Sequence, residues 1–317
     1  MRKAALLYNP DSGGNVARRR RELQSSLEVL RNGGVEADLI LAESRDRAGD
    51  QIRQAIAAGC DTIFACGGDG TIHNVAQVLA NSAVALAILP MGTANALAHD
   101  LGLPLSVVGA AEAALRAVPR RVALGHVNYV DLQGSADARY FVITAGVGVD
   151  AHLFYKLHTR TKKRMGMAAY YAKAWNLWFT YPMTRFVAEY METGSDAPRR
   201  AEVTELMSIR IRNFGGVLQQ LAPGASLDRD DMRVVVCRTA SRLSYLAYVA
   251  RSLLRQRWKV PGIDLAYSTK VSCGYLASSA HREPRKIYIE ADGELLGMLP
   301  VEITLVPNAL TLLAPSP

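Results

Sequence analysis

The chain has 317 residues and a formal net charge of +8, and half of its residues are hydrophobic. A length above 300 residues exceeds what one hydrophobic core usually holds, so we expect two domains. The excess of Lys and Arg favours an anionic partner, for which a nucleotide, a nucleic acid or an acidic lipid surface all qualify.

Several classes of protein are excluded by what the sequence lacks. No apolar run is long enough to cross a bilayer, and the five apolar residues at 4–8 are too few for a signal-peptide core. The four cysteines show no metal-ligand or CxxC spacing, which is typical of buried thiols in a reduced compartment. We therefore expect a cytoplasmic protein that is soluble or at most attached to a membrane surface.

The first 120 residues alternate between short apolar runs and amphipathic segments, in the pattern of strand and helix. We expect strands at 4–8, 35–41, 62–65 and 84–89, and helices at 16–31, 48–58 and 72–79. This order predicts a doubly wound parallel α/β sheet, whose ligands bind at the carboxyl ends of the strands. Asn9 and two glycine-containing turns, 67–71 and 91–95, fall at such ends.

The first turn, Cys66-Gly-Gly-Asp-Gly-Thr71, joins a buried strand to a helix. Glycines without a Cβ let backbone N–H groups approach phosphate oxygens, and the helix N-terminus adds a favourable dipole. Asp69 is the only ionisable group in the turn. Because a carboxylate repels phosphates unless a cation intervenes, Asp69 indicates a divalent metal or a role in proton transfer.

The second turn follows the next strand and contains Gly92, Thr93 and Asn95. Its hydroxyl and amide groups suit either the cap of a helix or the binding of a ligand. Capping would explain each residue taken alone. Two polar, glycine-containing turns after adjacent strands favour a ligand site.

The second half of the chain consists mainly of short segments with the composition of strands. We expect strands at 123–132, 140–148, 206–213, 232–238, 270–275, 286–289, 301–306 and 310–314. Many short strands with few helices predict an antiparallel β-sandwich. Residues 193–200 are expected to form an exposed loop.

Basic residues gather in three segments. Two helices expected at 152–181 and 245–258 combine them with tryptophan and tyrosine, which suits a membrane interface, although the aromatic spacing of the first also fits core packing. The arginine run 18–21 is most simply a solvated helix face, with contact to phosphate or membrane as the alternative.

Four motifs resemble, in order, those of the diacylglycerol kinase catalytic domain family, which includes bacterial soluble lipid kinases, sphingosine kinases and ceramide kinases. They are the Asn9-Pro10 turn before Gly13-Gly14, the turn 67–71, the segment 90–95 and the late Asp292-Gly293-Glu294. The glycine motif alone is shared with NAD kinases, but the ordered set spans nearly the whole chain.

The resemblance implies a kinase with an NAD-kinase-like α/β domain at 1–122 and a β-sandwich lipid-substrate domain at 123–317, whose final strand is a candidate to return to the first domain. It implies ATP and Mg²⁺ as cofactors. Asp292 would be the general base, Glu294 would support it or the metal, and Asp69 would organise the Mg²⁺-nucleotide. The nucleotide-binding residues would be Asn9, Gly67, Gly68, Gly70, Thr71, Gly92, Thr93 and Asn95.

Bacterial members of that family also bind a structural divalent cation in an Asp-Gly loop. The matching stretch is 223–232, in which Asp231 stands where the family has glycine. The implied ligands are Leu227, Asp230 and Met232. This chain departs from the family pattern twice more, with Asn74 where a glutamate is common and Ala96 where an aspartate often follows the asparagine.

Three functions are therefore weighed. The first is a lipid kinase that acts on a lipid alcohol at an anionic membrane surface. The second is an NAD kinase, against which the basic, tryptophan-bearing helices and the segment 90–95 argue. The third is a nucleotide- or lipid-binding protein without catalysis. No recognition-helix, RNP or zinc pattern supports a nucleic-acid partner. A homodimer is left open.

Overall fold

The computed structural model describes residues 1–10, 16–42, 45–156, 178, 180, 182–215, 221–276 and 285–315. The chain forms two compact units. Unit 1 comprises Met1–Leu124, Asn213–Gly216 and Val306–Pro317, and unit 2 comprises Gly125–Arg212 and Val217–Leu305. The last residues of the chain therefore lie in the same unit as the first.

Unit 1 is built on a parallel sheet. Its strand order is β2 (Glu36–Leu41), β1 (Lys3–Tyr8), β3 (Thr62–Gly67) and β4 (Ala85–Pro90). Beside β4, and parallel to it, runs the end of β14 (Glu294–Ala314), where Thr311 is opposite Ala85. Every residue of β3 and β4 is buried, as expected for parallel strands that are covered on both faces.

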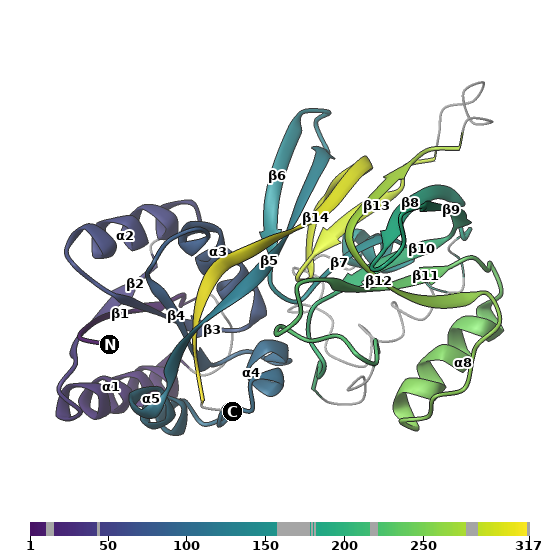
Figure 1. Cartoon of the computed structure of the whole chain (residues 1–317). Coiled ribbons are helices and arrows are strands. Elements are labelled where there is room, and N and C mark those ends of the chain that lie inside the picture. The colour runs from purple at the N-terminus through teal and green to yellow at the C-terminus, as the bar shows by residue number, and fades with distance from the viewer. Residues whose placement is uncertain are drawn as a thin grey trace. The chain divides into compact units, whose positions relative to one another are not determined.

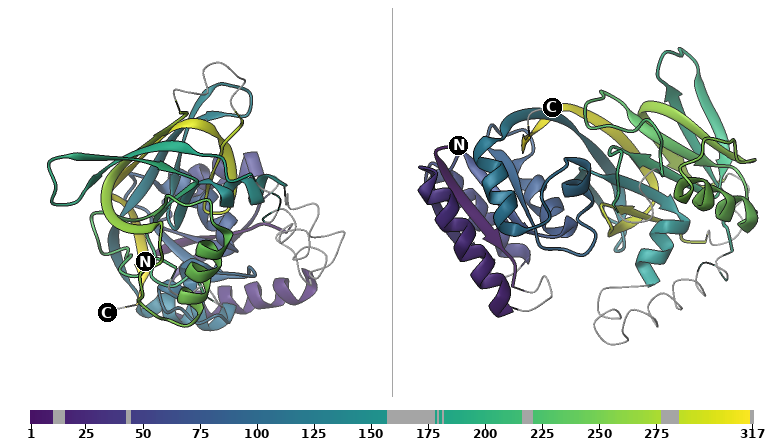
Figure 2. Two further views of the ribbon diagram at one scale, coloured as in Figure 1. Left: turned by 90° about the vertical axis from the view of Figure 1, so that its right-hand side faces the viewer. Right: turned by 90° about the horizontal axis from the view of Figure 1, so that it is seen from below.

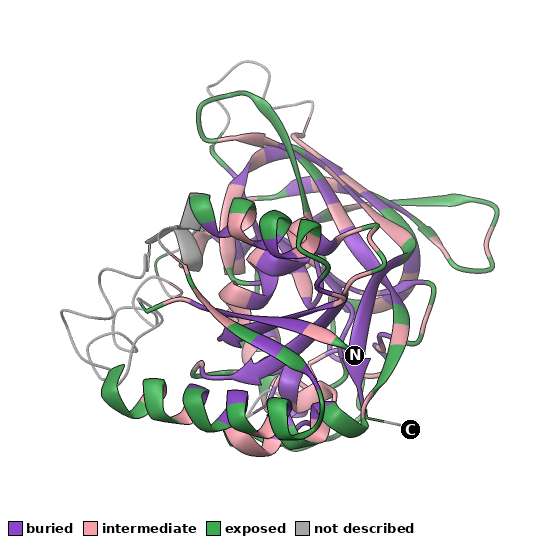
Figure 3. Ribbon diagram, turned by 90° about the vertical axis from the view of Figure 1, so that its left-hand side faces the viewer, coloured by how far each residue is buried: buried purple, intermediate pink, exposed green. Residues whose placement is uncertain are grey.

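Helices cover both faces of this sheet, which confirms the predicted doubly wound fold. On one face lie α1 (Val16–Asn32) and α5 (Val107–Arg116), and on the other lie α2 (Arg45–Ala57) and α3 (Asp69–Leu79) (Figures 1 and 2). Leu23, Leu27 and Leu30 of α1 share one core with Tyr8 and Phe64 of the strands. Figure 3 shows these strands buried and the outer sides of the helices exposed.

Unit 2 is an antiparallel β-sandwich, as predicted. Its main strand order is β13 (Tyr288–Ala291), β7 (Thr144–Gly148), β10 (Glu205–Ile209), β11 (Met232–Cys237), β12 (Ile263–Gly274), β8 (Phe186–Glu192) and β9 (Pro198–Val203). The first part of β14 pairs with both β13 and β12, and β5 (Val118–Asp131) pairs with β6 (Ala136–Phe141). The strands thereby enclose one apolar core.

Several expectations for unit 2 need correction. The single strand expected at 140–148 is the end of β6 and the whole of β7, and β8 lies where no strand was expected. Residues 193–200 are not all loop, because only 193–197 connect β8 to β9, and β9 begins at Pro198. The two strands expected at 301–306 and 310–314 are parts of the single strand β14.

The helices of unit 2 lie against its sheet. The expected helix 152–181 begins earlier, as α6 (Val149–Lys156), and nearly all of its remainder lies outside the described residues. The expected helix 245–258 is α8 (Arg242–Leu253), which begins at a Ser241 cap and packs on one face of the sheet (Figures 1 and 2). In the part of the chain that the structure describes, no helix is long and apolar enough to cross a membrane.

Candidate active site

The two glycine-containing turns meet at the carboxyl ends of β3 and β4. The backbone N–H of Met91 donates to the carbonyl of Gly67 at 2.9 Å, which extends the pairing of the two strands into the turns. A Cβ on Gly92 would stand 2.4 Å from the Cα of Gly68, and a Cβ on Gly68 would stand 3.0 Å from the Cα of Gly92. The backbones of the two turns therefore touch, and neither position has room for a side chain.

The turn after β3 leads directly into α3, whose N-cap is Gly68. Thr71 donates its backbone N–H to the Gly68 carbonyl at 2.9 Å, and its side chain fills the space that a Cβ on Gly67 would need. The first-turn N–H groups of a helix have no acceptor within the helix, and they carry the positive end of its dipole. The combination of glycine backbone and helix N-terminus is suited to phosphate groups.

Asn95 fixes the shape of the second turn. Its Oδ1 accepts the backbone N–H of Gly92 at 2.8 Å, and its Nδ2 donates to the Gly92 carbonyl at 3.1 Å. The residue has a φ of 48° and precedes α4 (Ala96–Asp100), so its amide holds the turn rather than capping that helix. Asparagine tolerates this left-handed conformation better than most residues. Thr93 lies beside it, exposed to solvent.

Asp69 is the first residue of α3 and is only partly buried. Its Oδ1 lies 3.5 Å from the backbone N–H of Leu97, which links the turn after β3 to α4. Asn9 follows β1, which is the strand next to β3. Because the two strands are parallel, Asn9 lies at the same carboxyl end of the sheet as the turn after β3. The structure thus brings Asn9 and Gly67–Thr71 together with Gly92–Asn95 in unit 1.

A residue that the sequence analysis did not single out also reaches the second turn. Arg19 of α1 donates from Nη2 to the carbonyl of Met91 at 2.6 Å. A pocket of about 420 Å³ lies there, and its lining includes Arg18, Arg19, Gly92 and Asn95. Of the arginine run, Arg18, Arg20 and Arg21 do lie on an exposed helix face, as expected, but Arg19 is part of the site. No sequence signal distinguishes it from its three neighbours.

Asp292 and Glu294 lie in unit 2, at the turn between β13 and β14. Asp292 is 7% exposed, and its carboxylate accepts three backbone N–H groups, from Val142 at 2.9 Å, Ile143 at 2.8 Å and Thr144 at 3.1 Å. Its φ is 50°, and its own N–H donates to Thr144. Asp292 therefore anchors the start of β7, whatever else it does. Glu294 is partly buried at the start of β14.

Three further carboxyl groups gather on one face of the same sheet. Glu290 is opposite Gly146, Glu205 is opposite Gly148, and the Asp150 carboxylate occupies the space where Gly146 lacks a Cβ. Burial raises the pKa of Asp150 to about 7, and burial together with the charge of Asp150 raises the pKa values of Glu205 and Glu290. Among the described residues, no group of three or more His, Cys, Asp or Glu side chains has a geometry that could hold a metal.

The loop expected to bind a structural cation is held by a cation of the protein itself, Arg210, which lies outside the loop in sequence. Arg210 is fully buried, and its guanidinium donates to the carbonyls of Asp231 at 2.6 Å, Arg229 at 2.8 Å and Leu227 at 3.3 Å. Burial lowers the pKa of Arg210 to about 10, so the group is charged at neutral pH. The Asp231 carboxylate accepts hydrogen bonds from both Nε and Nη2 of Arg229, at 2.6 and 2.8 Å.

These contacts leave the loop unsuited to a divalent metal. The Leu227 carbonyl already binds Arg210, Asp230 is exposed, and Met232 lies within β11 opposite Ser268. A divalent ion beside a buried guanidinium would meet like-charge repulsion. The expected ligands Leu227, Asp230 and Met232 therefore do not fit a metal here. An arginine within an apolar strand-like run was the signal in the sequence that could have indicated this.

Comparisons with known proteins agree on both halves of the chain. Residues 3–127 match the family model for the diacylglycerol kinase catalytic domain, and residues 143–314 match that for the YegS C-terminal NAD kinase beta sandwich-like domain. A diacylglycerol kinase of Bacillus subtilis (strain 168) is 26% identical over 305 residues, which cover 95% of this chain and 93% of the relative. A diacylglycerol kinase of Staphylococcus aureus (strain Newman) is 24% identical over 318 residues, which cover 99% and 93%.

Solved structures share the fold. That of a diacylglycerol kinase from Bacillus anthracis str. Sterne superposes with a TM-score of 0.70 at 17% identity and covers 99% of this chain and 96% of its own. That of yeast NADH kinase complexed with NADH gives a TM-score of 0.53 at 10% identity and covers 99% and 84%.

Proposed function

The chain belongs to the diacylglycerol kinase catalytic domain family, with a YegS-type C-terminal domain, and we propose that it transfers the γ-phosphate of ATP to the hydroxyl of a diacylglycerol-like lipid alcohol. The observation that carries this proposal is the contact between Gly68 and Gly92. It joins two glycine-containing turns at the carboxyl ends of adjacent parallel strands, where doubly wound sheets bind nucleotides.

In this proposal the turn Gly67–Thr71 and the N-terminus of α3 bind the nucleotide phosphates. Asn9, Thr93 and Asn95 bind the remainder of the nucleotide, with Asn95 also keeping the second turn in shape. Arg19, which contacts the Met91 carbonyl, adds positive charge beside the pocket next to this turn. Phosphoryl transfer depends mainly on such positioning and charge neutralisation.

Mg²⁺ is the proposed cofactor, and Asp69 would hold it together with the phosphates. A single, partly exposed carboxylate at the start of a helix fits this ion, which usually takes one or two carboxylates besides phosphate oxygens and water. When bound, the ion neutralises charge on the phosphates. No described residue supplies a second carboxylate in either turn, in keeping with Ala96 and Asn74 at positions where acidic residues are common in the family.

Asp292 is the proposed general base, which accepts the proton of the lipid hydroxyl, and Glu294 is its proposed support. The three backbone N–H groups that bind the Asp292 carboxylate fix its orientation. A fixed orientation is what a general base requires. The same bonds give Asp292 a structural duty, so its substitution should affect both activity and folding.

The acceptor is tested by supplying alternatives side by side. Purified protein is incubated with Mg²⁺ and γ-labelled ATP, with mixed micelles containing a diacylglycerol, a sphingoid base or a monoacylglycerol, and separately with NAD. The proposal expects label in a lipid product and at most a trace in NAD. Transfer to NAD in preference to every lipid would replace the proposal with NAD kinase activity. ATP binding without transfer to any acceptor would support a binding protein without catalysis.

A further inference from the structure

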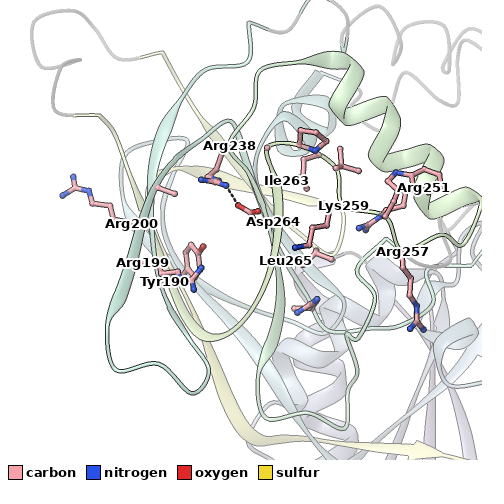
Figure 4. A pocket seen from close by; sticks show the side chains of 16 residues that line it. Tyr190, Arg199, Arg200, Arg238, Arg251, Arg257, Lys259, Ile263, Asp264 and Leu265 are labelled. Atoms are coloured by element: carbon pink, nitrogen blue, oxygen red, sulfur yellow. Dashed lines mark ion pairs between the residues drawn. The ribbon is translucent and has the colours of Figure 1, made fainter.

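Unit 2 contains a strongly basic pocket that the proposed kinase chemistry does not use. It has a volume of about 830 Å³ and lies between the hairpin β8–β9, the strands β11 and β12, and the segment 257–262 that follows α8. Its lining includes six arginines and one lysine but a single carboxylate, that of Asp264. Figure 4 shows that the labelled arginines and Lys259 come from several elements around the pocket. Such an excess of positive charge favours an anionic ligand.

Only part of this charge is neutralised within the protein. Three ion pairs involve the lining, namely Arg199 with Glu192 at 2.8 Å, Arg200 with Glu189 at 3.4 Å and Arg238 with Asp264 at 2.7 Å. The four other cations have no ion pair within 4 Å to any carboxylate that the structure describes: Arg233, Arg251, Arg257 and Lys259. Four positive charges at the pocket thus have no carboxylate partner among the described residues, although Arg233 and Arg251 each stack on a tyrosine ring.

Arg251 is the most informative of the four, because it is only 5% exposed. Its guanidinium stacks on the ring of Tyr248, with the central carbon 4.2 Å from the ring centre. Its Nε and Nη2 are buried and have no hydrogen-bond acceptor among the described residues. Buried donors normally find a partner, and leaving a charged donor without one is costly. Arg251 thus leaves an uncompensated buried charge in the wall of the pocket, which an anion in the pocket would neutralise.

Apolar side chains stand exposed next to this pocket. Leu254 is 62% exposed and Trp258, which lines the pocket, is 43% exposed. Leu253, at the end of α8, is also exposed. Tryptophan and leucine beside basic residues are typical of surfaces that lie at the headgroup level of a bilayer. A small soluble anion would leave these apolar side chains exposed to water, whereas a bilayer would bury them. The exposed side chains therefore favour a lipid ligand.

We propose that this pocket, together with Leu253, Leu254 and Trp258, is a docking site for a membrane surface that carries anionic phospholipids. One phosphate headgroup enters the pocket and binds Arg251, Arg257 and Lys259, while Trp258 and the two leucines enter the interface. The site shares no residue with the glycine turns of unit 1, and it would hold the enzyme on the membrane that contains its substrate.

Vesicle co-sedimentation tests this without ATP and without a lipid alcohol, so the result does not depend on the proposed kinase activity. The wild-type protein is mixed with vesicles of phosphatidylcholine alone or with one third phosphatidylglycerol, at about 0.05, 0.15 and 0.5 M salt. We expect binding only to the anionic vesicles, and binding that weakens as salt rises. The double variant Arg257→Gln/Lys259→Gln should bind about 25-fold more weakly, because each surface cation contributes roughly fivefold.

The matched control removes two charges elsewhere. Arg53→Gln/Arg116→Gln alters two exposed arginines of unit 1 and should bind the anionic vesicles within about twofold of the wild type. If both double variants lose affinity equally, net charge alone causes binding and the proposed site is wrong. Trp258→Ser should weaken binding at every salt concentration, because the apolar contribution is not screened. An unchanged affinity for Trp258→Ser would also contradict the proposal.

Arg251→Met separates the pocket from the surface around it. This change removes a buried charge whose donors lack acceptors, so thermal stability should be maintained or raised while anionic-vesicle binding falls at least fivefold. Binding unchanged in a folded Arg251→Met variant would show that no headgroup enters the pocket. If inorganic phosphate or glycerol phosphate bound the pocket but anionic vesicles did not, a soluble anion would be the ligand and the membrane proposal would fail.

Discussion

The Cα atoms of Gly68 and Gly92 belong to different turns, yet neither glycine has room for a methyl group facing the other. A Cβ on Gly92 would be 2.4 Å from the Gly68 Cα and 2.7 Å from Oδ1 of Asn95. Neither atom can move aside easily. The Gly68 Cα belongs to the backbone, and the Asn95 amide is held by two hydrogen bonds to Gly92. The two proposed nucleotide-binding turns therefore hold each other in place.

Gly92→Ala should separate these turns. The methyl group must displace backbone, which we expect to cost about 1–3 kcal/mol of stability and to weaken ATP binding at least tenfold. Isothermal titration with ATP and a thermal melt measure the two effects. Gly274→Ala is the matched control, because nothing lies within 4 Å of a Cβ at Gly274. Equal ATP affinity in both variants would show that the turn contact is not needed for nucleotide binding.

Arg210 should be the cation that holds the loop 227–231. Replacing it with methionine leaves three carbonyls without their donor in a buried position, and we expect a loss of about 3 kcal/mol in the free energy of unfolding. Arg200→Met, which removes an exposed ion pair, should cost less than about 1 kcal/mol. EDTA should leave the melting temperature of the wild type unchanged. A clear drop with EDTA, restored by Mg²⁺, would indicate a structural metal after all.

The stability of unit 2 should decrease as pH rises through the range in which Asp150 ionises. Its folded-state pKa of about 7 lies above the ordinary value of 3.8, so between these values the folded protein binds a proton that the unfolded chain has lost. The contribution of this group to stability is therefore greatest below about pH 4. Between about pH 4 and pH 7 it declines by about 1.4 kcal/mol for each pH unit. Glu205 and Glu290 act in the same direction.

Urea unfolding at pH 5.0 and pH 7.5 measures this dependence. Asp150→Asn should be less affected by pH than the wild type over that interval. Asp137→Asn is the control, because a hydrogen bond from Tyr129 lowers the pKa of Asp137 and its contribution is lost only at more acidic pH. If the stability of Asp150→Asn depended on pH as strongly as that of the wild type, Asp150 and its neighbours Glu205 and Glu290 would not be the cause of the pH dependence.

Asp292→Asn should reduce phosphate transfer and stability together. The amide offers one acceptor oxygen in place of two, and its NH₂ group would face the backbone N–H groups of residues 142–144. We expect at least a 100-fold loss of transfer and a lower melting temperature. Glu294→Gln serves for comparison and should mainly affect transfer. A folded Asp292→Asn protein with wild-type turnover would remove Asp292 from the role of general base.

Much of the fold follows from the hydrophobic pattern of the sequence. The strands β1, β3 and β4 of unit 1 are apolar runs that are buried on both faces, and helices with a single apolar face separate them along the chain. Strand β9 escaped prediction because it begins with Pro198 and two exposed arginines and ends the strand order of unit 2. At this sheet edge only Ala201 and Val203 contact the core, so the apolar alternation is too short to indicate a strand.

The site was predictable to the extent that its residues are contiguous in sequence. Glycines and polar residues at strand ends marked the turns 67–71 and 91–95 because the topology of a parallel sheet brings such ends together. Arg19 and Arg210 act through contacts 72 and 17–21 residues away. Nothing local distinguishes Arg19 from its neighbours, and the apolar run around Arg210 indicates a buried cation without indicating which groups it binds. The loop 223–232 shows the same limit, because its sequence allowed a metal while Arg210 lies outside it.

The central claim is that the turn after β3 serves phosphoryl transfer to a lipid, and Asp69→Ala tests it most directly. Asp61→Ala is the matched control, because Asp61 lies at the opposite end of β3 and contacts the N-terminal segment through Arg2. Initial rates of label transfer from ATP to diacylglycerol in mixed micelles are compared at equal, verified folding. The account predicts that Asp69→Ala loses at least 100-fold while Asp61→Ala remains within about threefold of the wild type. Undiminished lipid phosphorylation by the Asp69→Ala protein would contradict it.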